Sequence, residues 1–341
     1  MTSDRSRPRR ARLADVAQAA GVSLGAASKA LSAPDTVRPR TLATVRAAVE
    51  RLGYVPSGAG RMLASRSTRM VGVVLPSLYH PIYATYFHEL QKLLAREDYL
   101  AVAMSHEFDK AVEQELISRL VSKGVDALVL IGARHDAATM AMIRRVGLPH
   151  VFAWAADEAA PPGAVGFSDR DGMVAIVRHL AGLGHRRIAM LNGDPRDNER
   201  AAWREQGVRD AARAHGIELA EVAVCPLTVD GGRDGFHRIA PVARGVTALI
   251  CSTDLLAAGA IDAARKDGIA VPDTLSVTGF DDIEMAELLT PGLTTVRVPV
   301  LELARLSVER VTAVLKGSEP VEAAVLPVSL VVRGSTGPAP R

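Results

Sequence analysis

The sequence predicts a two-part protein of the α + α/β class, in which a small helical head precedes a body of two α/β subdomains. The chain has 341 residues, which is enough for two or three folding units of ordinary size. Residues 13–31 hold two short helical patterns separated by a glycine. From residue 70 onward, short apolar runs alternate with helical patterns, which is typical of parallel sheets covered by helices.

The head and the body also differ in net charge. Residues 1–69 contain 13 Lys and Arg against 4 Asp and Glu, a net charge of +9, whereas the remainder contains 28 against 34, a net charge of −6. A basic head on an acidic body favours contact between the head and a polyanion. A solvated basic tail is the simpler alternative, and charge alone leaves it open.

The head is predicted to begin with a helix, a turn and a second helix. Gly21 can adopt the positive φ of a sharp turn between residues 13–20 and 24–31. Ser23 suits the N-cap of the second helix because its hydroxyl can accept a hydrogen bond from a free backbone amide. The positions expected to be buried are Leu13, Val16, Ala17, Ala20, Ala27 and Leu31.

A third helix and a linker complete this half of the chain. Pro39 suits the first turn of the helix and Gly53 its end, and the apolar stripe between them is Leu42, Val45, Val49 and Leu52. The linker, residues 57–69, contains Gly58 and Gly60, each of which costs a helix about 1 kcal/mol relative to alanine. We therefore expect a marginal helix that is ordered only when something binds it.

The body is predicted to form two doubly covered parallel sheets with a ligand cleft at the carboxyl ends of their strands. The runs expected to be strands are MVGVVLP, YLAVAM, DALVLIG, PHVFAWA, RRIAMLNG, VTALICS and LSVTGFDD. The helical patterns include 84–96, 171–183, 200–215, 254–267 and 301–315. The low-complexity end, RGSTGPAPR, is expected to be a frayed tail.

Several classes of protein are excluded by what the sequence lacks. No apolar run approaches the roughly 18 residues of a membrane span, and the basic start has no apolar core of a signal peptide. Cys225 and Cys251 show no metal or redox spacing, so we expect a cytoplasmic protein without a metal. The chain has no P-loop, dinucleotide fingerprint, zinc helix or nucleophile elbow, which predicts no enzyme and no cofactor, and His185 is expected to end a helix.

Five segments, in order, resemble the lactose repressor (LacI) family of ligand-responsive bacterial transcription factors. They are LADVAQAAGVSLGAASKALS, GYVPSGAGRMLAS, GHRRIAML, VTGFDD and LPVSLVVRGSTGP. The resemblance implies a helix-turn-helix head, a hinge helix and a periplasmic-binding-protein-like effector domain of two α/β subdomains. The boundaries expected are 1–56 for the head, 57–69 for the hinge, 70–168 plus 299–323 for the first subdomain and 169–298 plus 324–341 for the second.

The resemblance places the second helix of the head in the major groove of DNA. Leu24 and Gly25 stand where the family mostly selects bases, and apolar contact, close backbone approach or the neighbouring Lys29 would supply the recognition there. Ser23 and Ser28 suit phosphate contacts. Two alternatives stay open: Leu24 as a partly exposed packing residue and Ser23 as a helix cap only.

The hinge is the second DNA contact that the resemblance implies. Residues 57–64 would form a short helix only on the operator, paired with the hinge of a second subunit in the minor groove. Leu63 would be inserted between the central base pairs, and Arg61 would lie near the DNA backbone. The alternative for Leu63 is a linker residue packed on the body.

In the body, the resemblance implies a pocket for a small-molecule effector. Tyr83 stands where the family commonly stacks an aromatic ring on the effector, and Arg204 matches an arginine that reaches hydroxyls or carboxylates. Thr253 and Asp281 match positions near the ends of later strands, and Asp281 could accept two hydroxyl hydrogen bonds. Asp254 is either a helix cap or a ligand contact.

Three positions depart from the family pattern and bear on the effector's identity. Trp154 stands where an aspartate is frequent, His80 where asparagine is frequent and Leu227 where an aromatic residue is frequent. A sugar is the class that the resemblance favours. A nucleoside or a less polar metabolite stays open, and Trp154 and Trp203 are both expected beside the cleft.

Together these features predict a homodimeric transcriptional repressor that binds a palindromic double-stranded operator and is controlled by the effector. We expect this protein to be cytoplasmic and associated with the nucleoid. Whether the effector is an inducer or a corepressor is left open. The alternative is a solute-binding or sugar-binding protein that does not bind DNA.

Overall fold

The computed structural model describes residues 11–55, 67–156, 160–239 and 244–340. Contacts divide the chain into two compact units, Met1–Thr68 and Arg69–Arg341. Arg61, Leu63 and most of the expected hinge lie outside the described residues. Within those residues, none of the helices has the length and apolar character needed to cross a membrane.

The first unit has the three predicted helices, with one turn of 3-10 helix between the second and third. Their bounds are α1 Leu13–Ala20, α2 Leu24–Ser32, η1 Pro34–Thr36 and α3 Pro39–Leu52. Gly21 and Gly53 both adopt left-handed φ, at 66° and 57°, where glycine carries no steric penalty. The Ser23 hydroxyl accepts a hydrogen bond from the Ala26 amide at 3.2 Å, so the predicted N-cap is confirmed.

The core of this unit is small and lies between the three helices. The buried apolar residues of its cluster are Val16, Ala20, Ala30, Val45 and Ala48. Leu52, expected on the buried stripe of α3, is 36% exposed. At that last turn Arg51 faces α1 instead and donates a hydrogen bond to the Ala19 carbonyl at 3.2 Å.

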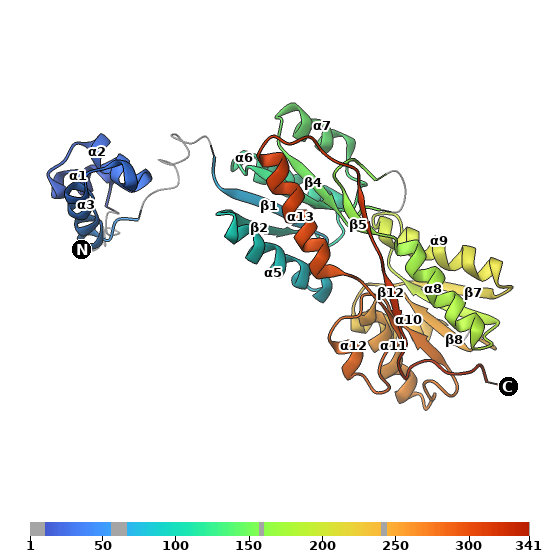
Figure 1. Ribbon diagram of the computed structural model, residues 1–341. Helices are drawn as coiled ribbons and strands as arrows, with labels where there is room; N and C mark the ends of the chain where they lie inside the picture. Colours follow the sequence, from blue (N-terminus) through green and yellow to red (C-terminus); the bar gives the residue numbers. More distant parts are fainter. Residues whose placement is uncertain (1–10, 56–66, 157–159, 240–243, 341) are drawn as a thin grey trace, which may run out of the picture. The chain divides into compact units, whose positions relative to one another are not determined.

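The first subdomain of the body is a six-stranded parallel sheet in the order β11-β5-β4-β3-β1-β2. Helices α5 and α13 cover one face and α6 and α7 the other (Figure 1). The strands are β1 Met70–Leu75, β2 Leu100–Ser105, β3 Ala127–Ile131, β4 His150–Ala153, β5 Val165–Phe167 and β11 Ala324–Leu326. The helices are α5 Pro81–Arg96, α6 Lys110–Ser122, α7 Ala137–Arg145 and α13 Val300–Leu315.

The second subdomain is a four-stranded parallel sheet in the order β7-β6-β8-β9, with an antiparallel ribbon of β10 and β12. Its strands are β6 Arg187–Asn192, β7 Glu218–Val224, β8 Ala248–Cys251, β9 Ser276–Thr278, β10 Thr295–Arg297 and β12 Ser329–Val331. Its helices are α8 Asp169–Gly182, α9 Glu199–Ala214, α10 Val229–Ile239, α11 Asp254–Lys266 and α12 Met285–Leu288.

The chain passes between the two subdomains three times. It leaves the first sheet after β5, returns to the first subdomain between β10 and α13, and leaves again between β11 and β12. Because parallel strands of one sheet end at the same edge, both sheets carry their loops toward the cleft between the subdomains. This arrangement agrees with the predicted fold class.

The C-terminal segment is not frayed, so that expectation was wrong. Ser335 is buried, and its hydroxyl donates to the Val277 carbonyl at 2.6 Å. The Ala339 amide donates to the Leu183 carbonyl at 2.9 Å, and the His185 Nε2 lies 3.1 Å from the Gly337 carbonyl. Small residues let this segment lie close to β9 and the end of α8, which composition alone did not reveal.

Candidate functional site

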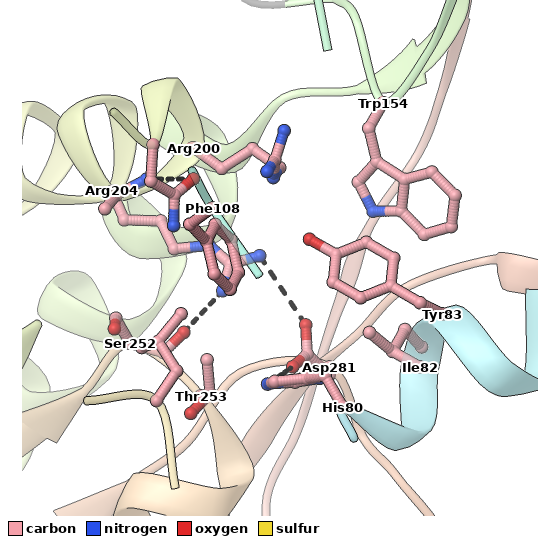
Figure 2. Close-up of a pocket in the computed structure, with 13 residues that line it drawn as sticks. His80, Ile82, Tyr83, Phe108, Trp154, Arg200, Arg204, Ser252, Thr253 and Asp281 are labelled. Atoms are coloured by element: carbon pink, nitrogen blue, oxygen red, sulfur yellow. Dashed lines mark hydrogen bonds and ion pairs between the residues drawn. The ribbon is translucent and has the colours of Figure 1, made fainter. Parts of the chain in front are cut away.

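A pocket lies between the two subdomains of the body and contains about 360 Å³ of space not filled by protein atoms, solvent at its mouth included. The six residues predicted to contact an effector all line it: Tyr83, Trp154, Arg204, Leu227, Thr253 and Asp281. Figure 2 shows how most of them point toward a shared space. The lining residues that were not among those six are His80, Ile82, Phe108, Asn198, Arg200, Ala201 and Ser252.

One wall of the pocket is aromatic. Tyr83, from the first turn of α5, and Trp154, directly after β4, have ring centroids 5.3 Å apart. Trp154 packs edge-on against Tyr86 at 4.6 Å. Its φ of 57° is strained for a bulky residue, and burial between neighbouring rings holds it there. Such a wall can cover the apolar face of a ring-shaped ligand.

The opposite wall is built on Arg204 of α9. Its Nε donates to the Asp169 carboxylate at 2.6 Å, its Nη1 to the Ser252 carbonyl at 2.5 Å, and its Nη2 lies 3.5 Å from Asp281 Oδ1. The guanidinium carbon is 3.8 Å from the centre of the Phe280 ring. Arg204 is therefore committed largely to protein partners, and its main role in this geometry is to orient the two carboxylates.

Asp281 and His80 keep polar atoms without partners at the pocket. Among the described residues, neither ring nitrogen of His80 nor Oδ2 of Asp281 has a hydrogen-bond partner, and Nε2 of His80 lies 3.8 Å from that oxygen. Burial, with the charges of Arg204 and Arg200, lowers the pKa of His80 to about 4. A neutral imidazole and a carboxyl group can together accept and donate hydrogen bonds to ligand hydroxyls.

Asp254 fills neither of the two roles left open for it. Thr253 is the N-cap of α11, and its hydroxyl accepts from the Leu256 amide at 3.3 Å. The buried Asp254 carboxylate accepts from the Ile283 amide at 2.8 Å and from the Thr295 hydroxyl at 2.5 Å. Asp254 therefore supports the loop that carries Asp281, whose φ is 112°.

Trp203, expected beside the cleft, is not among the residues that line this pocket. It lies on α9, where the Arg134 guanidinium sits 5.2 Å above its ring. Arg134 belongs to the first subdomain and Trp203 to the second. The pair therefore bridges the two subdomains, and Trp154 alone of the two tryptophans reports on the pocket wall.

The pKa of Asp281 predicts how stability depends on pH. Burial raises its pKa from an ordinary value of 3.8 to about 7, against the opposing charge of Arg204. The folded state then binds this proton more tightly than the unfolded state, so the contribution is present below about pH 4 and is lost as pH rises to about 7. Thermal unfolding measured across this window should show a flatter pH dependence in Asp281→Asn than in the wild type. The same pH dependence of thermal unfolding in the two proteins would contradict the raised pKa of Asp281.

In the head, the residues predicted to contact DNA form the outer face of α2. Leu24 is 54% exposed. A side chain at Gly25 would meet open space, and Ser28 and Lys29 are both exposed. Ser23 caps the helix and is also exposed.

Comparison with known proteins agrees with this combination of a helix-turn-helix head and a two-subdomain body. Residues 12–57 match the family described as bacterial regulatory proteins of the lacI family. Residues 177–336 match the periplasmic binding protein-like domain. An uncharacterized HTH-type transcriptional regulator from the aml 5' region of Streptomyces limosus is 34% identical over 346 residues, covering 95% of this chain and 94% of that protein.

Solved structures give the same result. The lac repressor dimer bound to operator and the anti-inducer ONPF is 25% identical with a TM-score of 0.85, over 96% of this chain and 100% of that one. The complex of the transcriptional regulator CelR with cellobiose is 28% identical with a TM-score of 0.71, over the same shares. The architecture is that of a DNA-binding transcriptional regulator with a ligand-responsive body, and not of an enzyme. The chain belongs to the LacI family.

Proposed function

We propose that this regulator is a homodimeric repressor that binds a near-palindromic operator through two copies of α2 and two hinges. The exposed face of α2, with Leu24, Gly25 and Lys29 uncovered, supports base contacts in the major groove. Ser23 and Ser28 would contact phosphates. Two-fold symmetry of a dimer would impose the matching symmetry on the DNA. The regulator would act in the cytoplasm, on the nucleoid.

We propose a sugar or a related polyhydroxylated metabolite as the effector. The observation that carries this is the pocket between the subdomains, where aromatic rings face unpartnered polar atoms of His80 and Asp281. A ligand bound to both walls changes the relative stability of conformations in which the subdomains are closer or further apart. A solute-binding protein would share this body, but the helix-turn-helix head favours the regulator.

The proposed domain boundaries follow the chain's passages between subdomains. Residues 1–56 form the head, 57–69 the hinge, 70–168 plus 299–323 the first subdomain, and 169–298 plus 324–341 the second. The pairing of β11 with β5 favours moving the last boundary to a point after residue 326.

The test of the proposal uses Leu63, which lies outside the described residues. Leu63→Ala should weaken binding to the operator by about tenfold or more, because the inserted side chain stabilises the bent DNA. Fluorescence anisotropy with the DNA upstream of its own gene, against a shuffled sequence, measures this. Val146→Ala, at an exposed apolar position of the body, is the control and should bind as the wild type does. Equal affinity of Leu63→Ala and the wild type would rule out the inserted leucine.

A further inference from the structure

We propose that the effector carries an anionic group, a carboxylate or a phosphate, that is bound by Arg200. This inference rests on the proposed effector function and narrows its chemical class. It is carried by the position of one arginine in the pocket and by the lack of an ion pair at its guanidinium among the described residues. Arg200 is not one of the residues that the family resemblance implies.

Arg200 is a buried cation without a partner. It is the second residue of α9 and is 6% exposed. Among the described residues, no carboxylate lies within 4.0 Å of its guanidinium, and it forms no hydrogen bond and no stacking contact with an aromatic ring. Arg204, one turn further along the same helix, is by contrast fully engaged by Asp169, Ser252 and Asp281. Figure 2 shows the Arg200 guanidinium directed toward the space beside Tyr83 and Trp154.

The other cations around Arg200 are paired with carboxylates: Lys110 with Glu113, Arg134 with Glu199 and Arg196 with Asp194. A second hollow, which shares Arg200 with the pocket, is lined by Lys110, Arg134 and Arg196 as well as by Asp197 and Glu199. The Glu199 carboxylate is already occupied, because it accepts from the Ala133 amide at 2.6 Å and from the Arg134 amide at 3.0 Å. Arg200 therefore forms no direct ion pair with the acid beside it on its own helix, and the carboxyl group it acts on at longer range is Asp281, whose pKa its charge lowers against the effect of burial.

A purely structural role explains this arrangement poorly. A cation in the first turn of a helix faces the positive end of the helix dipole, and Arg200 has no ion pair among the described residues to offset this repulsion. An anion bound at Arg200 would offset this repulsion and would form charge-assisted hydrogen bonds, which are the strong ones in proteins. We therefore expect the partner of the Arg200 guanidinium to be an anionic group of a bound ligand.

The rest of the pocket defines what else that partner must carry. His80 and Asp281 offer unpartnered polar atoms to hydroxyl groups, and Tyr83 and Trp154 offer ring faces. These groups together suit a ligand that combines hydroxyl groups with a ring. A sugar acid and a sugar phosphate share this chemistry, so the experiment must distinguish the two.

The test is a panel of pentoses and hexoses in matched sets, each with the neutral sugar, its aldonate and its phosphate ester. Binding to the full-length protein is followed by tryptophan fluorescence, and release of operator by anisotropy. We expect one anionic compound to bind at least about tenfold more tightly than its neutral parent. Arg200→Gln should reduce the affinity for that anion to the level of the neutral sugar. The aldonate and phosphate arms identify which anion is used.

A second measurement separates a binding role from a structural one. Without ligand, Arg200→Gln should raise the thermal unfolding temperature, because it removes a cation from the positive end of α9. Arg213→Gln, at an exposed position of the same helix, should leave it unchanged. A lower unfolding temperature for Arg200→Gln would overturn the proposal. A neutral sugar that binds best and releases the operator would also overturn it while the proposed function stands, whereas no binding by any compound would overturn both.

Discussion

Replacing Arg204 by methionine is expected to lower the free energy of unfolding by about 3–5 kcal/mol and to abolish the response to effector. The change removes the cation that faces Asp169 and Asp281 in a buried site. The two carboxylates then repel each other without compensation, and the Ser252 carbonyl loses its donor. Methionine keeps much of the packing against Phe280, so the loss measures charge rather than volume.

Denaturant unfolding and an operator-release titration with effector measure the two effects. Arg209→Met provides the control on the same helix, because Arg209 is exposed and pairs with Glu205 one turn away. Such exposed pairs contribute less than about 1 kcal/mol. If Arg204→Met and Arg209→Met cost the same, the buried network does not stabilise the fold as described.

Replacing Glu199 by alanine is expected to increase the population of the open arrangement of the two subdomains by about tenfold or more. Glu199 stands at the start of α9 in the second subdomain, and its carboxylate accepts hydrogen bonds from Ala133 and Arg134 of the first. A hydrogen bond to a charged group contributes about 1.5–3 kcal/mol. Its loss shifts the equilibrium between closed and open arrangements by that amount.

Amide hydrogen exchange at Ser252 and Thr253 reports this opening, because both residues line the pocket and neither is a hydrogen-bond partner of Glu199. Faster exchange there in Glu199→Ala is the expected result. Glu115→Ala, which removes an exposed carboxylate of α6, should exchange as the wild type does. Unchanged exchange in Glu199→Ala would show that other contacts hold the subdomains together.

Local signals predicted the parts of the fold that local chemistry decides. The turn at Gly21 and the cap at Ser23 follow from backbone geometry, and the strongly apolar strands were evident from their runs. Strand β7, Glu218–Val224, was missed because it lies at a sheet edge and two glutamates, Glu218 and Glu221, interrupt its apolar run. The docked tail was missed because its small residues make their contacts with distant parts of the chain.

The candidate site also contains residues that sequence predicts and residues that only tertiary contacts decide. The resemblance to the LacI family predicted six pocket residues, but it gave no reason to select Arg200 or Phe108. Arg200 is distinguished only by the absence of a partner within the described residues, which no sequence pattern expresses. Phe108 reaches the pocket from the loop after β2, where its φ of 63° places the ring in a way that periodicity cannot predict. Tertiary contacts therefore decide these two positions.

The three passages of the chain between subdomains have a consequence for biosynthesis. The first sheet is complete only when β11 pairs with β5, and the second subdomain only when Ser335 reaches β9. Neither can be finished until nearly the whole polypeptide has left the ribosome. The head needs only residues near the start and can fold while translation continues. A nascent chain therefore gains its three-helix head well before it gains a pocket.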